Sequence, residues 1–216
     1  MKIFINPGHM PGVDSGAVNE TYGVTEADIV KEIGVRVQQY LNRVGYDCML
    51  VQSDNLCGES PNYTNICASA NGWKADLFLS IHCNAAAAEE AQGTETLVYS
   101  SDSAEACGLA ECIQNQIVQS LGTVDRGVKE RPGLAVLRET DMPAVLVETA
   151  FITNKEDVQL LMNRKDEFAR AIARGVTDYV AQKGCETMNM WRISNEFLLG
   201  YLLGILTGVL LFTLVI

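Results

Sequence analysis

Two histidines and two glutamates carry the clearest sign of chemistry in this sequence. His9 and His82 are its only histidines, and each follows a short apolar segment. Glu148 likewise follows the apolar segment PAVLV, and Glu26 begins the first long predicted helix. Two His and one Glu suit a catalytic zinc site, where three protein ligands leave a fourth position for water. A second Glu outside the metal's coordination shell accepts the proton of that water. Together the four residues suit hydrolysis of an amide.

The elements that must position these residues alternate between strands and long helices. Strands are predicted at residues 2–5, 48–51, 77–81, 94–99, 134–137 and 144–147. Helices are predicted from a capping box at Thr25 and Asp28 to Gly45, and at residues 63–72, 103–121, 155–162 and 166–182. This alternation predicts an α/β fold: a mostly parallel, roughly six-stranded sheet flanked by helices.

Such a sheet would gather the reactive side chains at one edge. Ligands of open parallel sheets bind at the carboxyl ends of the strands, where His9, His82 and Glu148 are expected. Glu26 is expected nearby, because the loop that begins at His9 must return to that edge.

Each of these residues also has an ordinary interpretation. A histidine at a strand end is more often a satisfied polar residue than a ligand, and a glutamate at a helix start favours the helix dipole. The presence of all four residues together is what indicates a catalytic metal site. Cys83 beside His82 suggests a Cys–His nucleophile only weakly, because adjacent strand residues face opposite sides.

Composition excludes some classes of protein and bounds the size. The chain has 216 residues, 48% of them apolar and 20% charged, which predicts one folded domain with a short appendage. Its net charge of −11 would repel a polyanion, so we expect no nucleic-acid partner. Seven cysteines without a CxxC pair are most simply buried free thiols, typical of a protein that folds in a reducing compartment.

The last twenty residues, 197–216, contain no charged residue and no proline. A helix of that length is about 30 Å long, enough to span a bilayer. We therefore predict a C-terminal transmembrane helix that anchors the protein in a membrane by a single pass, after a linker at 185–196. Gly200, Gly204 and Gly208 share one helix face, which indicates either self-association or a lone anchor that tolerates glycine. The charges nearby do not decide the side of the membrane on which the domain lies.

Four segments resemble a known family in order and spacing. INPGHMPGVDSGA, GVTEADIV, ADLFLSIHCNA and MPAVLVETAFITN are similar to the sequential blocks of zinc-dependent N-acetylmuramoyl-L-alanine amidases with a family-3 catalytic domain. The resemblance runs from about residue 2 to residue 181 and defines a catalytic domain at 1–184. It implies cleavage of peptidoglycan between the lactyl group of muramic acid and L-alanine. It also implies Zn²⁺ ligands at His9, Glu26 and His82, and a catalytic glutamate at Glu148.

Three further residues are candidates for supporting roles. Asp14 is expected either to accept a hydrogen bond from a ligand histidine in the second shell or to form a turn. Asn84 is expected to bind substrate amides or to cap its strand. Arg138 is expected to bind a carboxylate of the stem peptide, or to be a solvated surface residue.

The sequence departs from the family pattern at three positions. Asn6 replaces the frequent Asp, Ile66 the common Arg, and Ala150 the usual Gly. The metal-site positions are intact, so an active hydrolase is predicted, with a role in wall remodelling, sporulation or phage lysis. Two alternatives stay open: a non-catalytic peptidoglycan-binding module held at the membrane, and a zinc carboxypeptidase.

Overall fold

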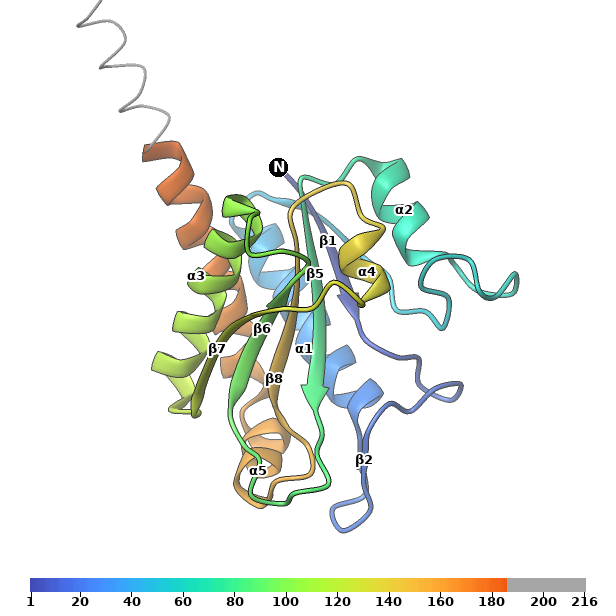
Figure 1. The fold of residues 1–216 in the computed structure, drawn as a ribbon, viewed down its shortest axis with the longest axis vertical. Helices are drawn as coiled ribbons and strands as arrows, with labels where there is room; N and C mark the ends of the chain where they lie inside the picture. The colour runs from blue at the N-terminus through green and yellow to red at the C-terminus, as the bar shows by residue number, and fades with distance from the viewer. Residues whose placement is uncertain (186–216) are drawn as a thin grey trace, which may run out of the picture. The chain divides into compact units, whose positions relative to one another are not determined.

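A computed structural model describes residues 1–185 and contains one six-stranded sheet (Figure 1). The strands lie in the order β4-β1-β5-β8-β6-β7. Their bounds are β1 Lys2–Pro7, β4 Asp47–Leu50, β5 Leu77–Asn84, β6 Thr94–Val98, β7 Asp125–Glu130 and β8 Ala144–Phe151. A separate hairpin pairs β2 (Val18–Asn19) with β3 (Val24–Thr25).

Helices cover both faces of this sheet. They are α1 Glu26–Arg43, α2 Ile66–Trp73, α3 Ala104–Leu121, α4 Ala135–Arg138 and α5 Lys155–Asn163. The chain divides into two compact units, 1–177 and 178–216. Residues 165–177 of the first unit are helical, as are the described residues 178–185 of the second.

The alternation of side chains along each strand divides the core in two. Phe4 and Phe78 stack with ring centroids 5.6 Å apart and pack with α2 and α4. Ile3 and Ile5 point to the opposite face and are fully buried there. On that side α1 packs tightly against β1, because Gly34 leaves room for Pro7: a Cβ at Gly34 would lie 2.6 Å from the Pro7 ring.

The predicted cap of the first long helix is confirmed. The Thr25 side chain accepts a hydrogen bond from the Asp28 amide and donates one of 2.7 Å to the Asp28 carboxylate. This reciprocal pattern fixes the helix start at Glu26. The candidate ligand Glu26 therefore stands at a defined position, directly after the β2–β3 hairpin.

The predicted α/β fold is observed, but the sheet is mixed and not simply parallel. β6 runs antiparallel to β8, while the other four pairs are parallel. The reason is the short connection 85–93: a parallel crossover needs a dozen or more residues. β6 therefore begins at the edge where β5 ends and runs back.

Two local predictions were wrong. Residues 134–137 were expected to form a strand, yet α4 is a short helix whose apolar side chains Val136 and Leu137 pack on the sheet. The edge strand β7 was missed because its sequence, DRGVKE, is mostly polar. An edge strand pairs on one side only, so it does not need a continuous apolar pattern.

The prediction of a transmembrane helix and of a membrane localisation must also be corrected. Within residues 1–185 the structure has no helix long and apolar enough to cross a bilayer. The two 18-residue helices, α1 and α3, are long enough but amphipathic, and α1 carries charges from Glu26 to Arg43. The predicted span 197–216 and its three glycines lie outside the described residues. The anchor and its self-association are therefore without structural support.

Candidate metal centre

Three of the predicted site residues lie together near the carboxyl ends of strands β1 and β5. His9 follows β1, Glu26 begins α1 and His82 lies in β5. One ligand atom from each lies within 4.8 Å of the other two. The His9 Nε2–Glu26 Oε2 distance is 3.1 Å and the His82 Nδ1–Glu26 Oε1 distance is 2.9 Å. The cluster is thus compact enough for all three side chains to bind one ion.

Glycines allow this close approach. A Cβ at Gly8 would lie 2.2 Å from the His82 ring, and one at Gly16 would lie 2.5 Å from the His9 ring. Gly16 also has a φ of 63°, in the left-handed region that glycine enters freely. His9 itself has a φ of 57°, which is uncommon for a residue with a side chain. The loop after β1 is therefore bent to turn its histidine toward Glu26.

Glu26 is a buried carboxylate surrounded by hydrogen-bond donors. The Ala17 amide donates to Oε2 and the Cys83 amide to Oε1, each at 3.0 Å. Burial opposes ionisation of Glu26, but the contacts with His82 and His9 outweigh it, so its pKa lies well below its usual range. The same contact with Glu26 raises the pKa of His9 to about 9. The cluster stabilises positive charge, as a cation site requires.

Asp14 lies on the far side of His9 from Glu26. Its Oδ2 is 2.5 Å from His9 Nδ1, and its Oδ1 accepts a hydrogen bond of 3.0 Å from the Gly16 amide. Asp14 therefore makes both contacts that the sequence left open, one to the histidine and one within the turn. The bond from His9 is the main reason that the pKa of Asp14 is lowered.

Glu148 lies on β8 directly across from His82 on β5. Both strands run on past the ends expected from sequence, so both residues are inside strands. Oε2 of Glu148 is buried and has no hydrogen-bond partner in the described part of the chain. Burial is the main reason that the pKa of Glu148 rises to about 7. Such an unsatisfied buried oxygen is rare in native proteins, and with a raised pKa it makes Glu148 a candidate functional group.

The structure separates the remaining candidates. Asn84 ends β5, two residues beyond His82, and its Oδ1 accepts a bond of 2.9 Å from the Ala85 amide. Arg138 is instead on α4, where it pairs with Glu139 at 2.8 Å. It lines a hollow beside Ala144, at the start of β8, whereas Glu148 lies further along that strand. The structure does not bring Arg138 to the metal cluster.

Cys83 faces away from the cluster, as strand alternation predicts. It is buried, and its Sγ lies 3.6 Å from the Thr149 hydroxyl. Burial raises the pKa of this thiol, so it stays protonated and is a poor nucleophile.

The three departures from the family pattern occupy core positions. Ile66 and Ala150 are fully buried. Asn6 is also buried; it donates to the Val51 carbonyl at 3.1 Å and accepts from the Ser80 hydroxyl at 3.0 Å. Its amide therefore joins β1 to β5 and to the chain after β4.

The sequence analysis missed one further buried glutamate beside the site. Glu95 on β6 lies directly across from Glu148 and is almost fully buried. It pairs with Arg126 at 2.7 Å and with Lys129 at 2.5 Å, both on β7. A charged residue inside the buried strand TETLV was the available signal, but its partners lay in the strand that was missed.

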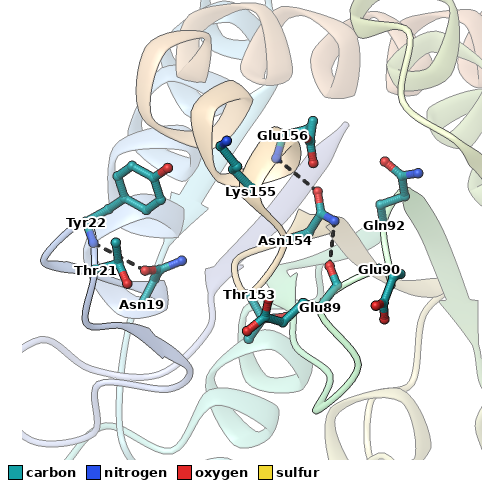
Figure 2. Close-up of a pocket in the computed structure, with 10 residues that line it drawn as sticks. All are labelled: Asn19, Thr21, Tyr22, Glu89, Glu90, Gln92, Thr153, Asn154, Lys155 and Glu156. Atoms are coloured by element: carbon teal, nitrogen blue, oxygen red, sulfur yellow. Dashed lines mark hydrogen bonds between the residues drawn. The ribbon is translucent and has the colours of Figure 1, made fainter.

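A polar hollow of about 700 Å³ opens beside the hairpin and the loops that follow β5 and β8 (Figure 2). Asn154 connects two parts of its lining: its side chain donates to the Glu89 carbonyl at 2.8 Å and accepts from the Glu156 amide at 3.1 Å. Asn19 of β2 donates to the Ile152 carbonyl at 2.8 Å, which ties the hairpin to the end of β8. The lining is Asn19, Thr21, Tyr22, Glu89, Glu90, Gln92, Thr153, Asn154, Lys155 and Glu156.

The fold and the cluster define a class: an α/β protein with a three-ligand candidate metal centre at one edge of its sheet. The comparisons make this class specific. The family model described as N-acetylmuramoyl-L-alanine amidase matches residues 3–178. The chain belongs to this family, which confirms the resemblance found in the sequence.

Relatives within the family differ in how much of their length the chain matches. It is 41% identical over 180 residues to the N-acetylmuramoyl-L-alanine amidase LytC of Bacillus subtilis, covering 82% of this chain and 35% of LytC. It is 34% identical to the endolysin of Bacillus phage SPP1, covering 83% and 65%. The crystal structure of an N-acetylmuramoyl-L-alanine amidase from Clostridium difficile 630 superposes with a TM-score of 0.73 at 30% identity, covering 84% and 97%. The chain thus spans about a third of LytC and nearly all of that crystallised chain.

Proposed function

We propose that this protein is a zinc-dependent hydrolase of peptidoglycan. It cleaves the amide between the lactyl group of N-acetylmuramic acid and the L-alanine of the stem peptide. The observation that carries the proposal is the cluster His9, Glu26 and His82, with its ligand atoms within 4.8 Å of one another, beside the unsatisfied oxygen of Glu148. Family membership supports the choice of substrate.

The donor set favours zinc over harder cations. Two imidazole nitrogens and one carboxylate form a common zinc set, whereas Mg²⁺ and Ca²⁺ prefer oxygen ligands alone. His9, Glu26 and His82 would hold the ion, and Asp14 would orient the His9 ring through its contact with Nδ1. When bound, zinc supplies a Lewis acid that polarises the scissile carbonyl and acidifies water.

Glu148 would move the proton that hydrolysis requires. Its carboxylate takes a proton from the attacking water and passes it to the departing amine nitrogen of L-alanine. In the metal-free protein burial raises the pKa of Glu148 to about 7, which moves the carboxyl toward the neutral range in which a group can both accept and return a proton. The absence of a protein partner at Oε2 within residues 1–185 leaves that atom free for this exchange.

The polar hollow is the proposed site for the peptide side of the substrate. It adjoins the hairpin that leads directly into Glu26 and the loops that leave His82 and Glu148. Asn84, between the metal cluster and these loops, is the proposed contact for a substrate amide. Arg138 lies on α4, and its predicted role in substrate binding stays a prediction that this placement does not support.

The decisive experiment is digestion of purified peptidoglycan by the full chain with zinc supplied. Mass spectrometry should find stem peptides with a new L-alanine amino terminus, and a chelator should stop their release. Release of a carboxyl-terminal amino acid without that amino terminus would favour the carboxypeptidase. Sedimentation with peptidoglycan without any product would favour the binding module.

The biological role is proposed more broadly. Relatives carry names that include a sporulation-specific amidase and a phage endolysin. We infer that this chain acts in wall remodelling, sporulation or lysis, and the chemistry of the site is the same in each case.

A further inference from the structure

Two cysteines far from the metal ligands in sequence lie in contact. Cys57 is in the loop between β4 and α2, and Cys67 is the second residue of α2. Their Sγ atoms are 2.7 Å apart. Both are free thiols in this structure, and 2.7 Å is longer than the S–S bond of about 2.05 Å, so the two sulfurs are adjacent but not bonded.

The backbone holds the two residues together independently of their side chains. The Ile66 amide donates to the Asn55 carbonyl at 3.0 Å, and the Cys67 amide donates to the Leu56 carbonyl at 2.9 Å. Two successive hydrogen bonds thus align the chain just before Cys57 with the start of α2. A disulfide needs its two α-carbons within about 7 Å of one another, so such alignment favours it.

The loop between the two cysteines is closed by its own hydrogen bonds. The Asn55 side-chain amide donates to the carbonyls of Ser60 and Tyr63, at 2.6 and 2.8 Å. The Ser53 hydroxyl donates to the Thr64 carbonyl at 2.6 Å. These contacts bring the chain back to the start of α2, where Cys67 lies beside Cys57.

We propose that Cys57 and Cys67 form an intramolecular disulfide when a small-molecule disulfide serves as oxidant. The Cys57 thiolate attacks the oxidant and releases one of its two thiolates. The Cys67 thiolate then attacks Sγ of Cys57 and releases the second. The two cysteine protons go to the two released thiolates, and the oxidant gains the two electrons. Cys57 is the entry point because it is partly exposed, whereas Cys67 is 4% exposed. Burial raises the pKa of both thiols, so little thiolate forms at neutral pH and the exchange is faster in mildly alkaline solution.

This bond would close residues 57–67, the second half of the connection between β4 and α2. The first half of that connection borders the metal centre: Gln52 donates to the carbonyls of Gly8 and Ala27, at 3.1 and 3.0 Å. Those two residues directly adjoin the proposed ligands His9 and Glu26. The disulfide differs from the sequence-based expectation of seven free thiols. It suits a protein that acts on the cell wall, outside the reducing cytoplasm, and that setting alone rests on the proposed function.

The test is oxidation of the full chain with glutathione disulfide, then alkylation of the remaining thiols under denaturing conditions. Cleavage by trypsin at Arg43 and Lys74 and by a Glu-specific protease at Glu59 places the two cysteines on separate peptides. Mass spectrometry without reductant should find residues 44–59 joined to residues 60–74, with the mass lowered by two hydrogen atoms. Reduction should separate them.

Matched variants assign the bond. Cys48 is on the same peptide as Cys57, so Cys48→Ser should keep the linkage while Cys57→Ser abolishes it. Oxidation should also raise the unfolding temperature of the unsubstituted chain and leave that of Cys57→Ser unchanged. Recovery of Cys57 and Cys67 as alkylated thiols, or each joined to glutathione or to another cysteine, would overturn the proposal. None of these readouts uses amidase activity, so failure here leaves the proposed function intact.

Discussion

Glu95 and Glu148 lie opposite each other on adjacent strands, but their carboxylates differ in the partners that the fold provides. Both lie near the same edge of the sheet, directly paired between β6 and β8. Arg126 and Lys129 both contact Oε2 of Glu95, at 2.7 and 2.5 Å. Oε2 of Glu148 is buried, and residues 1–185 provide it with no partner. The charge of Glu95 is thus balanced by two cations, whereas one carboxyl oxygen of Glu148 has no hydrogen-bond donor within residues 1–185.

The acidities of the two groups follow from this difference. Burial raises the pKa of both, but in Glu95 the contacts with Lys129 and Arg126 outweigh it and the pKa falls. In Glu148 burial prevails, and the pKa rises to about 7. A paired buried carboxylate indicates a structural role, whereas an unpaired one indicates a group held ready for chemistry.

Removal of the unpaired charge should have the largest effect on activity. Glu148→Gln keeps the shape of the side chain but cannot accept a proton. We expect kcat for peptide release to fall by about 10²–10⁴-fold, the usual contribution of a general base. Zinc content, measured by atomic absorption, should stay unchanged. Unaltered turnover in this variant would show that Glu148 is not the base.

Asp14 tests a third carboxylate, which is paired with a proposed metal ligand. Asp14→Asn keeps the turn contact with Gly16 but weakens the contact with His9. Loss of such an orienting group typically costs about 10–100-fold in metal affinity. Titration with a competing chelator measures this loss. Asp28→Asn is the matched control, because Asp28 bonds to Thr25, the N-cap of α1, and makes no hydrogen bond to a proposed ligand within residues 1–185. Equal zinc affinity in all three proteins would remove Asp14 from the metal site.

Removal of the paired charge should affect stability more than chemistry. Glu95→Gln leaves Arg126 and Lys129 without their anion, and hydrogen bonds to charged groups contribute about 1.5–3 kcal/mol. Both cations are about one-third exposed, so we expect a loss near the lower end, about 1–2 kcal/mol in the free energy of unfolding. Urea denaturation measures it, with peptide release assayed well below the midpoint. A fall in kcat as large as that of Glu148→Gln would erase the distinction between the two carboxylates.

The pH dependence of stability should differ in sign between the two groups. The folded pKa of Glu148 is raised from 4.5 to about 7, so the folded state favours its protonated form. Stability from this group is present below 4.5 and is lost as the pH rises through 7. The lowered pKa of Glu95 has the opposite effect: stability is present above its unfolded value and is lost as the pH falls through the folded value.

Metal-free protein makes this pH contrast measurable. The free energy of unfolding of Glu148→Gln, relative to the unsubstituted chain, should grow as the pH rises from 4.5 to about 7. For Glu95→Gln the deficit should shrink as the pH falls below that range. A pH-independent difference for Glu148→Gln would mean that its carboxyl is not perturbed by burial.

Much of the fold could be predicted from local patterns. The cap at Thr25, the apolar strand around Leu79 and the periodic helix α3 each depend on a few neighbouring residues, and each was placed correctly. The exceptions are elements whose conformation depends on distant partners. β7 is polar and exists because β6 pairs with it, and α4 is helical where an apolar run suggested a strand.

The sequence by itself determined which side chains are available for chemistry: two histidines, a few glutamates at element ends, and glycines where the backbone must approach closely. Residue type and short spacing suffice for that, because they act over one or two turns of chain. The sequence also led us to expect that His9, Glu26 and His82 converge, and the structure supplies their distances. Only the tertiary structure decided that Glu95 is neutralised and Glu148 is not, and that Cys57 touches Cys67. Those outcomes depend on strand order and on the reach of loops, which join residues tens of positions apart and leave no local pattern.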